Sequence, residues 1–262
     1  MLIGLAFINP VKRWVNYAAE PKENADIKVI SFNTRTGILK RSEVGDYLKS
    51  QNADVILLQE DAGKGYEFAG YEKVSTLRGI TILSRHKVIS EKILEPEQEG
   101  LKTPAIQVDI EINGKKYRFI DVYLNPFKFG KEMVALNGNT DANEQKVKGI
   151  IKRLIPTFKK HQEQIELIKQ VVENSPYPVI VAGDFNSVPN SYEYYQLSEG
   201  LEDAFVTAGK GSATSFHDYK FPIRIDYIFS SKSIHAVSYK VDRSVSLSDH
   251  YPIVAEFSAD KK

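Results

Sequence analysis

The sequence predicts a single α/β domain, in which two β-sheets pack face to face and helices cover them from outside. Apolar runs of strand length outnumber the segments with helical spacing among the 262 residues. Two alternating segments flank Asn113-Gly114, a tight-turn pair that indicates an antiparallel hairpin. Helical segments separate other strands, which indicates crossover connections as well. With 42% hydrophobic residues, the chain can bury the core that such a fold needs.

The domain is expected over residues 27–258, after an arm or linker formed by residues 1–26. A helix is predicted over 41–51, because its apolar residues recur on one face. The predicted strands are, in chain order, 29–33, 54–59, 79–84, the two arms of the hairpin within 105–123, 178–183, 224–229, 235–241 and 251–257.

The second half of the chain contains the longest predicted connection and the longest predicted helix. Residues 125–144 are rich in Gly and Asn and predict a long connection. Helical spacing follows over 145–174, and a shorter helix is expected near 191–199. Pro156 lies inside the longer segment, where a proline removes a backbone donor and is expected to break or kink the helix.

Composition and the N-terminus leave the compartment open. Without cysteine the chain has no disulfide, no thiolate nucleophile and no cysteine-ligated zinc. The net charge of +1 supplies no global attraction for nucleic acid, so any basic surface must be local. Residues 1–9 are apolar but too short to span a bilayer, and we interpret them as a packing arm of a soluble domain. The end of a truncated membrane anchor or export segment stays the alternative, with Lys12-Arg13-Trp14 at the membrane surface.

Acidic or amide side chains end several of the predicted strands. The segments concerned are 29–33, 56–60, 181–186, 224–228 and 248–250. Because the ends of neighbouring strands meet at the rim of a sheet, their side chains can converge. Together they offer oxygen ligands for Mg²⁺ or Mn²⁺ and a base for phosphate chemistry. This pattern predicts a phosphoesterase active site.

The most specific segment runs from Val179 through Asp184 and Asn186. Asp184 and Asn186 lie two residues apart and therefore on the same side of an extended chain. Such a pair can hold one water, with the carboxylate taking its proton and the amide orienting it. A capped turn after a strand is the alternative, because Asp, Asn, Ser and Pro all form turns. Asn33 and Glu60 alone indicate only rim polarity, but their joint occurrence with this pair favours a site.

A histidine close to two acidic residues is the other informative group. Asp249 and His250 precede the final strand, and Asp226 begins an earlier one. A carboxylate beside a histidine fixes the tautomer and favours the imidazolium, which can face a phosphate oxygen. The remaining histidines are interpreted as structural, with His217 a partial exception because it precedes the segment of Asp226; they are His86, His161, His217 and His235.

The ordered set of motifs resembles the endonuclease/exonuclease/phosphatase superfamily over roughly the whole predicted domain. The resemblance implies a four-layered αββα sandwich of two mixed, mainly antiparallel sheets with helices outside. It also implies Mg²⁺-dependent cleavage of phosphate esters, with Mn²⁺ as the alternative metal. The metal ligands that it implies are Glu60, Asn33 and Asp249. The residues to which it assigns roles in the reaction are Asp184 and Asn186, which orient water, and Asp226 and His250, which form a pair.

Two positions depart from the commonest pattern of the superfamily. Tyr123 stands where many members have histidine. The abasic endonucleases also have tyrosine there, so the resemblance implies that its phenol can donate to a phosphate oxygen. A strand aromatic on the core face is the alternative for Tyr123. Arg35 stands where abasic endonucleases have a ligating Asp, and resembles the arginine of deoxyribonuclease I that meets phosphate. We therefore expect one metal, and phosphate contacts from Arg35, Asn186 and His250.

The expected function is that of a metal-dependent phosphodiesterase, with nucleic acid as the first choice of substrate. The enzymatic alternative is a phosphatase or phospholipase C-type enzyme on a phosphoinositide, sphingomyelin or a small phosphomonoester. An inactive phosphate-binding module is the remote alternative, because every position that the chemistry requires is filled. Nothing indicates an obligate protein partner, and a monomer is expected. One basic segment is interpreted either as a solvated helix face or as a phosphate-tracking patch; it contains Lys146, Lys148, Lys152, Arg153, Lys159 and Lys160.

Overall fold

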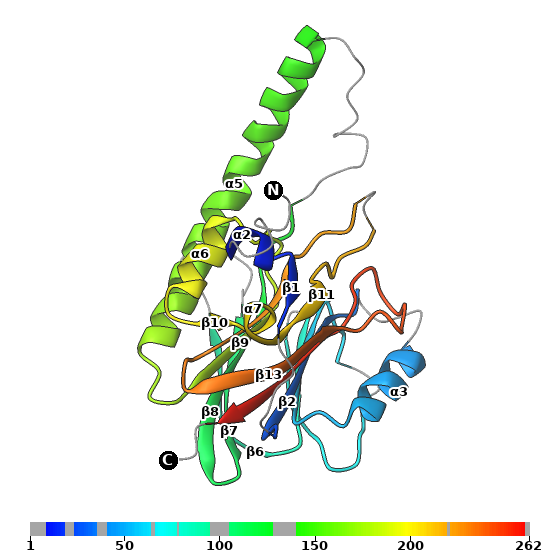
Figure 1. The fold of residues 1–262 in the computed structure, drawn as a ribbon, viewed down its shortest axis with the longest axis vertical. Coiled ribbons are helices and arrows are strands. Elements are labelled where there is room, and N and C mark those ends of the chain that lie inside the picture. Colours follow the sequence, from blue (N-terminus) through cyan, green and yellow to red (C-terminus); the bar gives the residue numbers. More distant parts are fainter. Residues whose placement is uncertain are drawn as a thin grey trace.

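A computed structural model describes residues 9–18, 24–35, 41–63, 66–77, 79–94, 105–127, 140–218 and 221–259. Its helices are α2 (Asn9–Lys12), α3 (Arg41–Gln51), α5 (Thr140–Glu173), α6 (Tyr192–Ser198) and α7 (Ala204–Ala208) (Figure 1). Its strands are β1 (Val15–Tyr17), β2 (Ile27–Asn33), β3 (Val55–Gln59), β4 (Glu72–Leu77), β5 (Ile80–Ser84), β6 (Lys87–Leu94), β7 (Ala105–Ile112), β8 (Lys115–Tyr123), β9 (Val179–Asp184), β10 (Glu202–Asp203), β11 (Lys210–Ser212), β12 (Asp226–Ser230), β13 (Ile234–Val241) and β14 (Ile253–Ala259).

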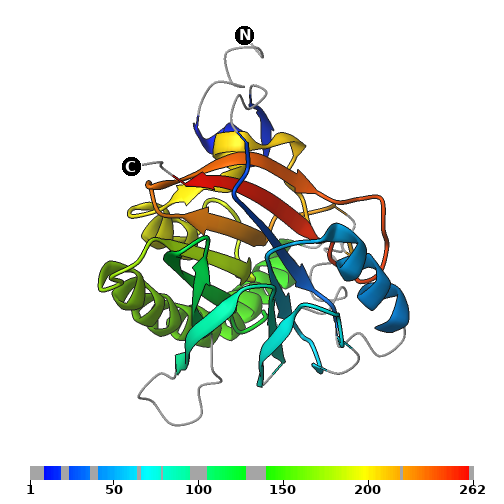
Figure 2. The same cartoon turned by 90° about the horizontal axis from the view of Figure 1, so that it is seen from below.

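The strands form two six-stranded sheets and one small pair. Sheet I has the order β13-β14-β2-β3-β5-β4, and sheet II has the order β10-β12-β9-β8-β7-β6. The neighbours β2–β3 and β8–β9 run parallel, and the other pairs within the sheets are antiparallel. Figure 2 shows α3 against one outer side of the sheets and the long α5 against the other. The predicted sandwich with helices outside is confirmed.

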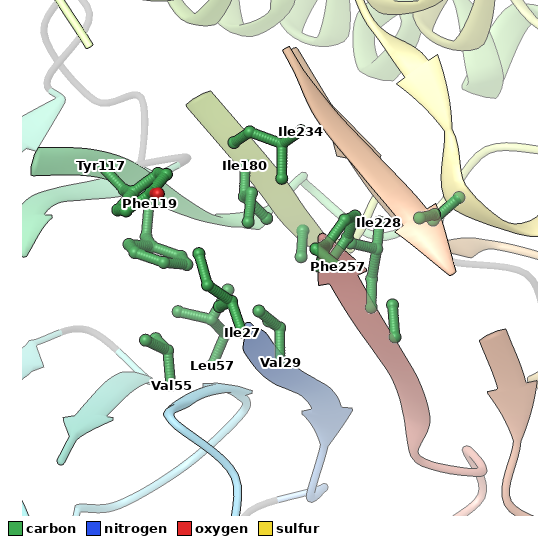
Figure 3. Close-up of a cluster of buried hydrophobic side chains, with 14 of the residues drawn as sticks. Ile27, Val29, Val55, Leu57, Tyr117, Phe119, Ile180, Ile228, Ile234 and Phe257 are labelled. Carbon is green, nitrogen blue, oxygen red and sulfur yellow. The ribbon is translucent and has the colours of Figure 1, made fainter. Parts of the chain in front are cut away.

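Three apolar clusters hold the four layers together. The cluster between the sheets includes Val29 and Leu57 of sheet I and Phe119 and Ile180 of sheet II (Figure 3). Residues that alternate with these point outward, because successive side chains of a strand face opposite sides. Ile30, Phe32, Ile56 and Leu58 accordingly meet α3, whereas Ile120, Val122 and Val181 meet α5 and α6. Burial on both faces explains why these strands read as continuous apolar runs.

The same alternation places the polar strand ends. Asn33 is four residues after Val29, Tyr123 four after Phe119, and Asp184 four after Ile180, so all three share the face between the sheets. Asp226, at the start of β12, pairs with Asp184 in the antiparallel register. These predicted site residues therefore lie at one end of the layer between the sheets.

Several predicted boundaries differ from the structure. Helix α5 begins at Thr140, within the predicted connection 125–144, and residues 128–139 lie outside the described part. Pro156 does not end this helix. The carbonyl of residue 152, which loses its partner, lies on the exposed half of α5, where water can replace the missing donor. Strands β1, β4, β6, β10 and β11 and helices α2 and α7 were not predicted; all but β4 and β6 are five residues long or shorter, and most side chains of β6 are exposed.

Part of the predicted N-terminal arm is docked on the body. Strand β1 pairs antiparallel with β11. The Arg13 guanidinium stacks over the rings of Tyr194 and Tyr195, at 4.6 and 4.7 Å from their centroids. The Arg13 carbonyl accepts a 2.7 Å hydrogen bond from Arg224 Nη1. None of the helices formed by the described residues is both long and apolar enough to cross a membrane.

Candidate active site

Three neighbouring strands of sheet II bring Tyr123, Asp184 and Asp226 into one row. Tyr123 is the register partner of Asp184 on β9, and Asp184 is the partner of Asp226 on β12. The row requires Gly183, because a Cβ at that position would stand 1.9 Å from the Val122 carbonyl oxygen. Its φ of +147° is also a conformation that other residues rarely adopt.

Both oxygens of Asp184 are held by fixed donors. The Asn186 backbone N–H donates to Oδ1 at 2.8 Å, and the Asn186 side-chain amide donates to Oδ2 at 3.3 Å. The same amide donates to the Leu124 carbonyl at 3.0 Å, which fixes its orientation. Asn186 has a φ of +49°, a left-handed conformation that Asn tolerates better than most residues. The pair predicted to orient water is therefore assembled, although the role itself stays a prediction.

Glu60 accepts hydrogen bonds from uncharged side chains of both sheets. Asn33 Nδ2 donates to Glu60 Oε1 at 3.2 Å and to Asp184 Oδ2 at 3.0 Å. The Tyr123 hydroxyl donates to Glu60 Oε1 at 2.8 Å. Tyr123 thus combines both interpretations of the sequence, because its ring packs against the core while its hydroxyl reaches the site. Burial, followed by the nearby charge of Glu60, raises the pKa of Tyr123, which keeps the phenol a donor.

His250 and Asp226 form the expected pair. His250 Nδ1 lies 2.9 Å from Asp226 Oδ2, and His250 Nε2 lies 3.8 Å from Asp184 Oδ2. Burial alone lowers the pKa of His250, but the carboxylates of Asp226 and Asp184 outweigh it and raise that pKa to about 9. The Ser215 hydroxyl donates to Asp226 Oδ2 and steadies the acid. The ring is therefore an imidazolium at neutral pH, with Nε2 turned toward Asp184.

Asp184 has the electrostatics of a base near neutral pH. Burial raises its pKa to about 7, opposed by the cationic His250 and reinforced by the charge of Asp226. A carboxylate with a pKa close to ambient pH can accept a proton from water and release it again.

Asp249 and Arg35 stand at the exposed side of the site. Arg35 Nη1 lies 3.1 Å from Asp249 Oδ2, and Ser248 Oγ donates to Asp249 Oδ1 at 3.0 Å. The Asn33 side-chain oxygen accepts from the Arg35 backbone N–H at 2.9 Å. The predicted phosphate contact of Arg35 therefore requires the guanidinium to share or leave Asp249, and that contact stays a prediction.

A cleft of about 360 Å³ opens over these groups. Its polar lining includes Glu60, Asp184, Asn186, Asp249 and His250. Its apolar lining consists of Pro126, Phe127, Phe158, Val188, Phe216, Ile223 and Ile225. Within the described part of the chain, no lysine or arginine lines it. The cleft therefore has one polar side and one apolar side.

The chemistry of the donors fits a divalent metal. Glu60, Asp184 and Asp249 present carboxylates to the cleft, and hard oxygen donors of this kind suit Mg²⁺. As oriented here, Asn33 points its amide nitrogen at two carboxylates, so a ligand role for its oxygen requires the amide to turn over. A second group of possible ligands, Asp184, Asp226 and His250, has its donor atoms within 4.8 Å of one another. A protonated His250 repels a cation, so this group is better suited to proton chemistry.

Some residues of the site had no signal in the sequence. Ser215, Phe127, Phe158 and Phe216 come from loops or from a helix face and belong to no motif. The other histidines have structural partners: His86 bonds Asp54, His161 bonds Glu193 and the Asn125 carbonyl, and His217 stacks on Tyr251. His217 therefore does not line the cleft with His250.

Comparisons with known proteins agree with this architecture. The model of the endonuclease/exonuclease/phosphatase family matches residues 30–250. No curated protein matches the sequence. An endonuclease/exonuclease/phosphatase from Bacteroides vulgatus superposes with a TM-score of 0.69 at 18% identity, covering 90% of this chain and 100% of that one. A mannosyl-6-phosphatase from Bacteroides thetaiotaomicron gives 0.65 at 18% identity, with 88% and 99% covered. A 3′ phosphatase from Neisseria bound to product DNA hairpin gives 0.64 at 18% identity, again with 88% and 99% covered. At these identities the structural likeness shows the fold alone.

Proposed function

The chain belongs to the endonuclease/exonuclease/phosphatase family, and on this premise we propose that it is a metal-dependent phosphoric ester hydrolase that uses water as the nucleophile. The observation that carries the proposal is the convergence of one held carboxylate, one imidazolium and further carboxylates on a single cleft. The names of relatives support the reaction class, since one is a mannosyl-6-phosphatase and another a 3′ phosphatase.

Asp184 is the proposed base. Its carboxylate is oriented by Asn186 and Asn33, and a pKa of about 7 lets it take the proton of a water aimed at phosphorus. The water oxygen forms the new bond to phosphorus, the ester P–O bond breaks, and the leaving oxygen takes up a proton. His250, held by Asp226, places a positive N–H beside the phosphate oxygens as their charge increases.

Glu60 and Asp249, with Asn33 beside them, are the residues that would hold Mg²⁺ or Mn²⁺. When bound, the metal supplies Lewis-acid polarisation of the phosphate. Tyr123 keeps Glu60 turned into the cleft through its 2.8 Å hydrogen bond. The carboxylates on the polar side of the cleft support this assignment, because an anionic phosphate would otherwise be repelled from it.

The choice of substrate depends on the rest of the cleft. Nucleic acid is supported by Arg35 at the site and by the lysines of α5, as the sequence led us to expect. The apolar wall favours the alternative, an ester whose second substituent is itself apolar, because beyond His250 a polyanion would find no lysine or arginine among the described lining residues. We therefore retain a lipid phosphate ester as the second candidate substrate. A monomer that needs no partner stays our expectation.

Hydrolysis in Mg²⁺ and in EDTA tests the proposal. The substrates are plasmid DNA, an abasic duplex, RNA, phosphoinositide, sphingomyelin and bis(p-nitrophenyl) phosphate. We expect metal-dependent hydrolysis that falls at least about 100-fold in Asp184→Asn and His250→Ala. Glu91→Gln, an exposed change on β6, is the matched control and should retain full activity. Activity that is insensitive to EDTA, or wild-type rates in both site variants, would contradict the proposal.

A further inference from the structure

Exposed apolar side chains occur at the cleft, in the loop before Ile223 and along α5. We call this set the apolar rim; it consists of Ile151, Ile155, Phe158, Val188 and Phe221. Phe158 and Val188 line the cleft. Phe221 is 72% exposed and lies between Phe216 and Ile223, which are bridged to each other and line the cleft too. Such side chains are costly to leave in water when they form a continuous surface rather than isolated points.

Helix α5 continues the rim away from the cleft. Ile151, Ile155 and Phe158 are spaced by four and three residues, so they lie on one face of the helix, with exposures of 52%, 47% and 46%. Ile165 and Ile168, farther along, are buried against sheet II. Figure 1 shows that the first half of α5 extends beyond both sheets. The helix is therefore anchored at one end and carries its apolar stripe outward at the other.

Basic side chains border this stripe. Residues 148–160 contain five lysines or arginines and no acidic residue. Lys148, Lys152 and Lys159 are exposed and, at about 100° per residue, lie in a row beside the apolar face. Lys148 also pairs with Glu144 at 2.6 Å, an exposed contact that salt and competing anions readily weaken. This half of α5 is thus an amphipathic, basic helix.

The combination distinguishes between partners. A nucleic-acid backbone would attract the lysines, but Ile151 and Ile155 are aliphatic and offer nothing to a phosphate or to a stacked base. A solvated helix face would explain the lysines and not the apolar stripe. A phospholipid surface accommodates both, since apolar side chains enter the acyl boundary while lysines meet anionic headgroups.

We propose that the apolar rim and the adjacent lysine row bind an anionic phospholipid surface, and that the cleft opens toward it to receive a lipid phosphate ester. The second half of this statement rests on the proposed function. Phe158 and Val188 belong to both the rim and the cleft wall, so these two side chains link the exposed rim to the site. The rings of Phe127 and Phe158 lie 4.9 Å apart and extend the wall inward. The apolar part of a substrate keeps contact with carbon while its phosphate reaches Asp184 and His250.

Vesicle binding tests the proposal without hydrolysis. The whole chain, in EDTA, is sedimented with large vesicles of phosphatidylcholine alone or mixed equally with phosphatidylglycerol. We expect binding to the mixed vesicles that falls as salt rises. Ile151→Ser/Ile155→Ser should weaken it by roughly tenfold or more, from the lost apolar burial. Lys148→Gln/Lys152→Gln should weaken it by roughly fivefold per lysine. Ile89→Ser, exposed on β6, and Lys92→Gln on the same strand are the matched controls and should bind as wild type.

Three measurements can contradict the proposal or test the proposed function separately. Absence of binding to mixed vesicles, or equal binding by the double isoleucine variant, would overturn the proposal. Binding to duplex DNA that needs the lysines, with none to vesicles, would assign α5 to nucleic acid instead. Hydrolysis of bis(p-nitrophenyl) phosphate in Mg²⁺ reports separately on the proposed function. The double isoleucine variant should hydrolyse this soluble diester at the wild-type rate, because neither residue lines the cleft.

Discussion

Gly183→Ala should destabilise the protein more than a Gly→Ala substitution at any other glycine in the described strands of the sheets. The new Cβ would stand 1.9 Å from the Val122 carbonyl oxygen, whereas real Cβ contacts essentially never fall below 3.0 Å. The neighbouring strands β8 and β9 must therefore separate by roughly 1 Å, which is more than their hydrogen bonds tolerate. Since Tyr123 and Asp184 are paired at this level, the active-site row would be disturbed as well.

The expected loss can be estimated from its parts. A φ of +147° at a non-glycine residue costs about 1–3 kcal/mol. About two ladder hydrogen bonds between β8 and β9 contribute about 1 kcal/mol each. The total of about 3–5 kcal/mol is a large share of the stability of a typical domain.

Urea unfolding of three alanine variants separates the cost of a positive φ from the cost of steric overlap between the new Cβ and the neighbouring strand. Gly114 has a φ of +77° but open space around the added Cβ, so Gly114→Ala should lose only the left-handed strain, about 1–2 kcal/mol. Gly200 has open space and no positive φ, so Gly200→Ala should lie within about 0.5 kcal/mol of wild type. A loss in Gly183→Ala no larger than that in Gly114→Ala would refute the close approach of β8 and β9.

Three further predictions concern individual charges. Asp226→Asn should lower the pKa of His250 from about 9, measured by NMR titration of the metal-free protein, and an unchanged pKa would disprove the pairing. Folding raises this pKa, so protonated His250 contributes to the free energy of unfolding. That contribution should be complete below about pH 6.5 and disappear as the pH rises through about 9. Glu60→Gln should keep the fold and reduce Mg²⁺ affinity by at least about tenfold in calorimetry, and unchanged affinity would remove Glu60 from the metal site. Burial opposes ionisation of Glu193, but the hydrogen bond from His161 holds its pKa below the usual value. The ionised Glu193 carboxylate should therefore stabilise the fold above about pH 5, and this stabilisation should be lost in acid. The difference in unfolding free energy between wild type and Glu193→Gln should accordingly shrink from pH 7 to pH 3.

The order of the elements could be predicted because local patterns specify it. Helix α3 has the predicted bounds, and the hairpin of β7 and β8 turns at Asn113-Gly114. Strand β6 could not be predicted, since most of its side chains are exposed and carry no apolar alternation. The continuation of α5 through Pro156 could not be predicted either. This stretch of the helix is exposed, so that water can bond the carbonyl freed at residue 152.

Most residues of the site could be predicted because they end strands. Asn33 and Asp184 follow directly from apolar runs that end in a polar residue, and Asp226 from a polar residue that begins such a run. The partners of these residues could not be predicted. In the structure the Tyr123 hydroxyl donates to Glu60, and the amide nitrogen of Asn33 faces two carboxylates; the phosphate contact of Tyr123 stays a prediction. Such contacts join residues of different sheets. The spacing of residues along one strand does not predict the distance between side chains on two sheets.

The sequence by itself determined the fold class and the family and supplied the candidate site residues, because strand periodicity and motif order are local properties of the chain. Only the tertiary structure decided which of these side chains meet, how burial and neighbouring charges shift the pKa values of Asp184 and His250, and what surrounds them. The apolar wall of Phe127, Phe158 and Phe216 comes from three separate segments. These three residues have no common spacing in the sequence. Only the packing of α5 and the loops over sheet II brings them to one cleft.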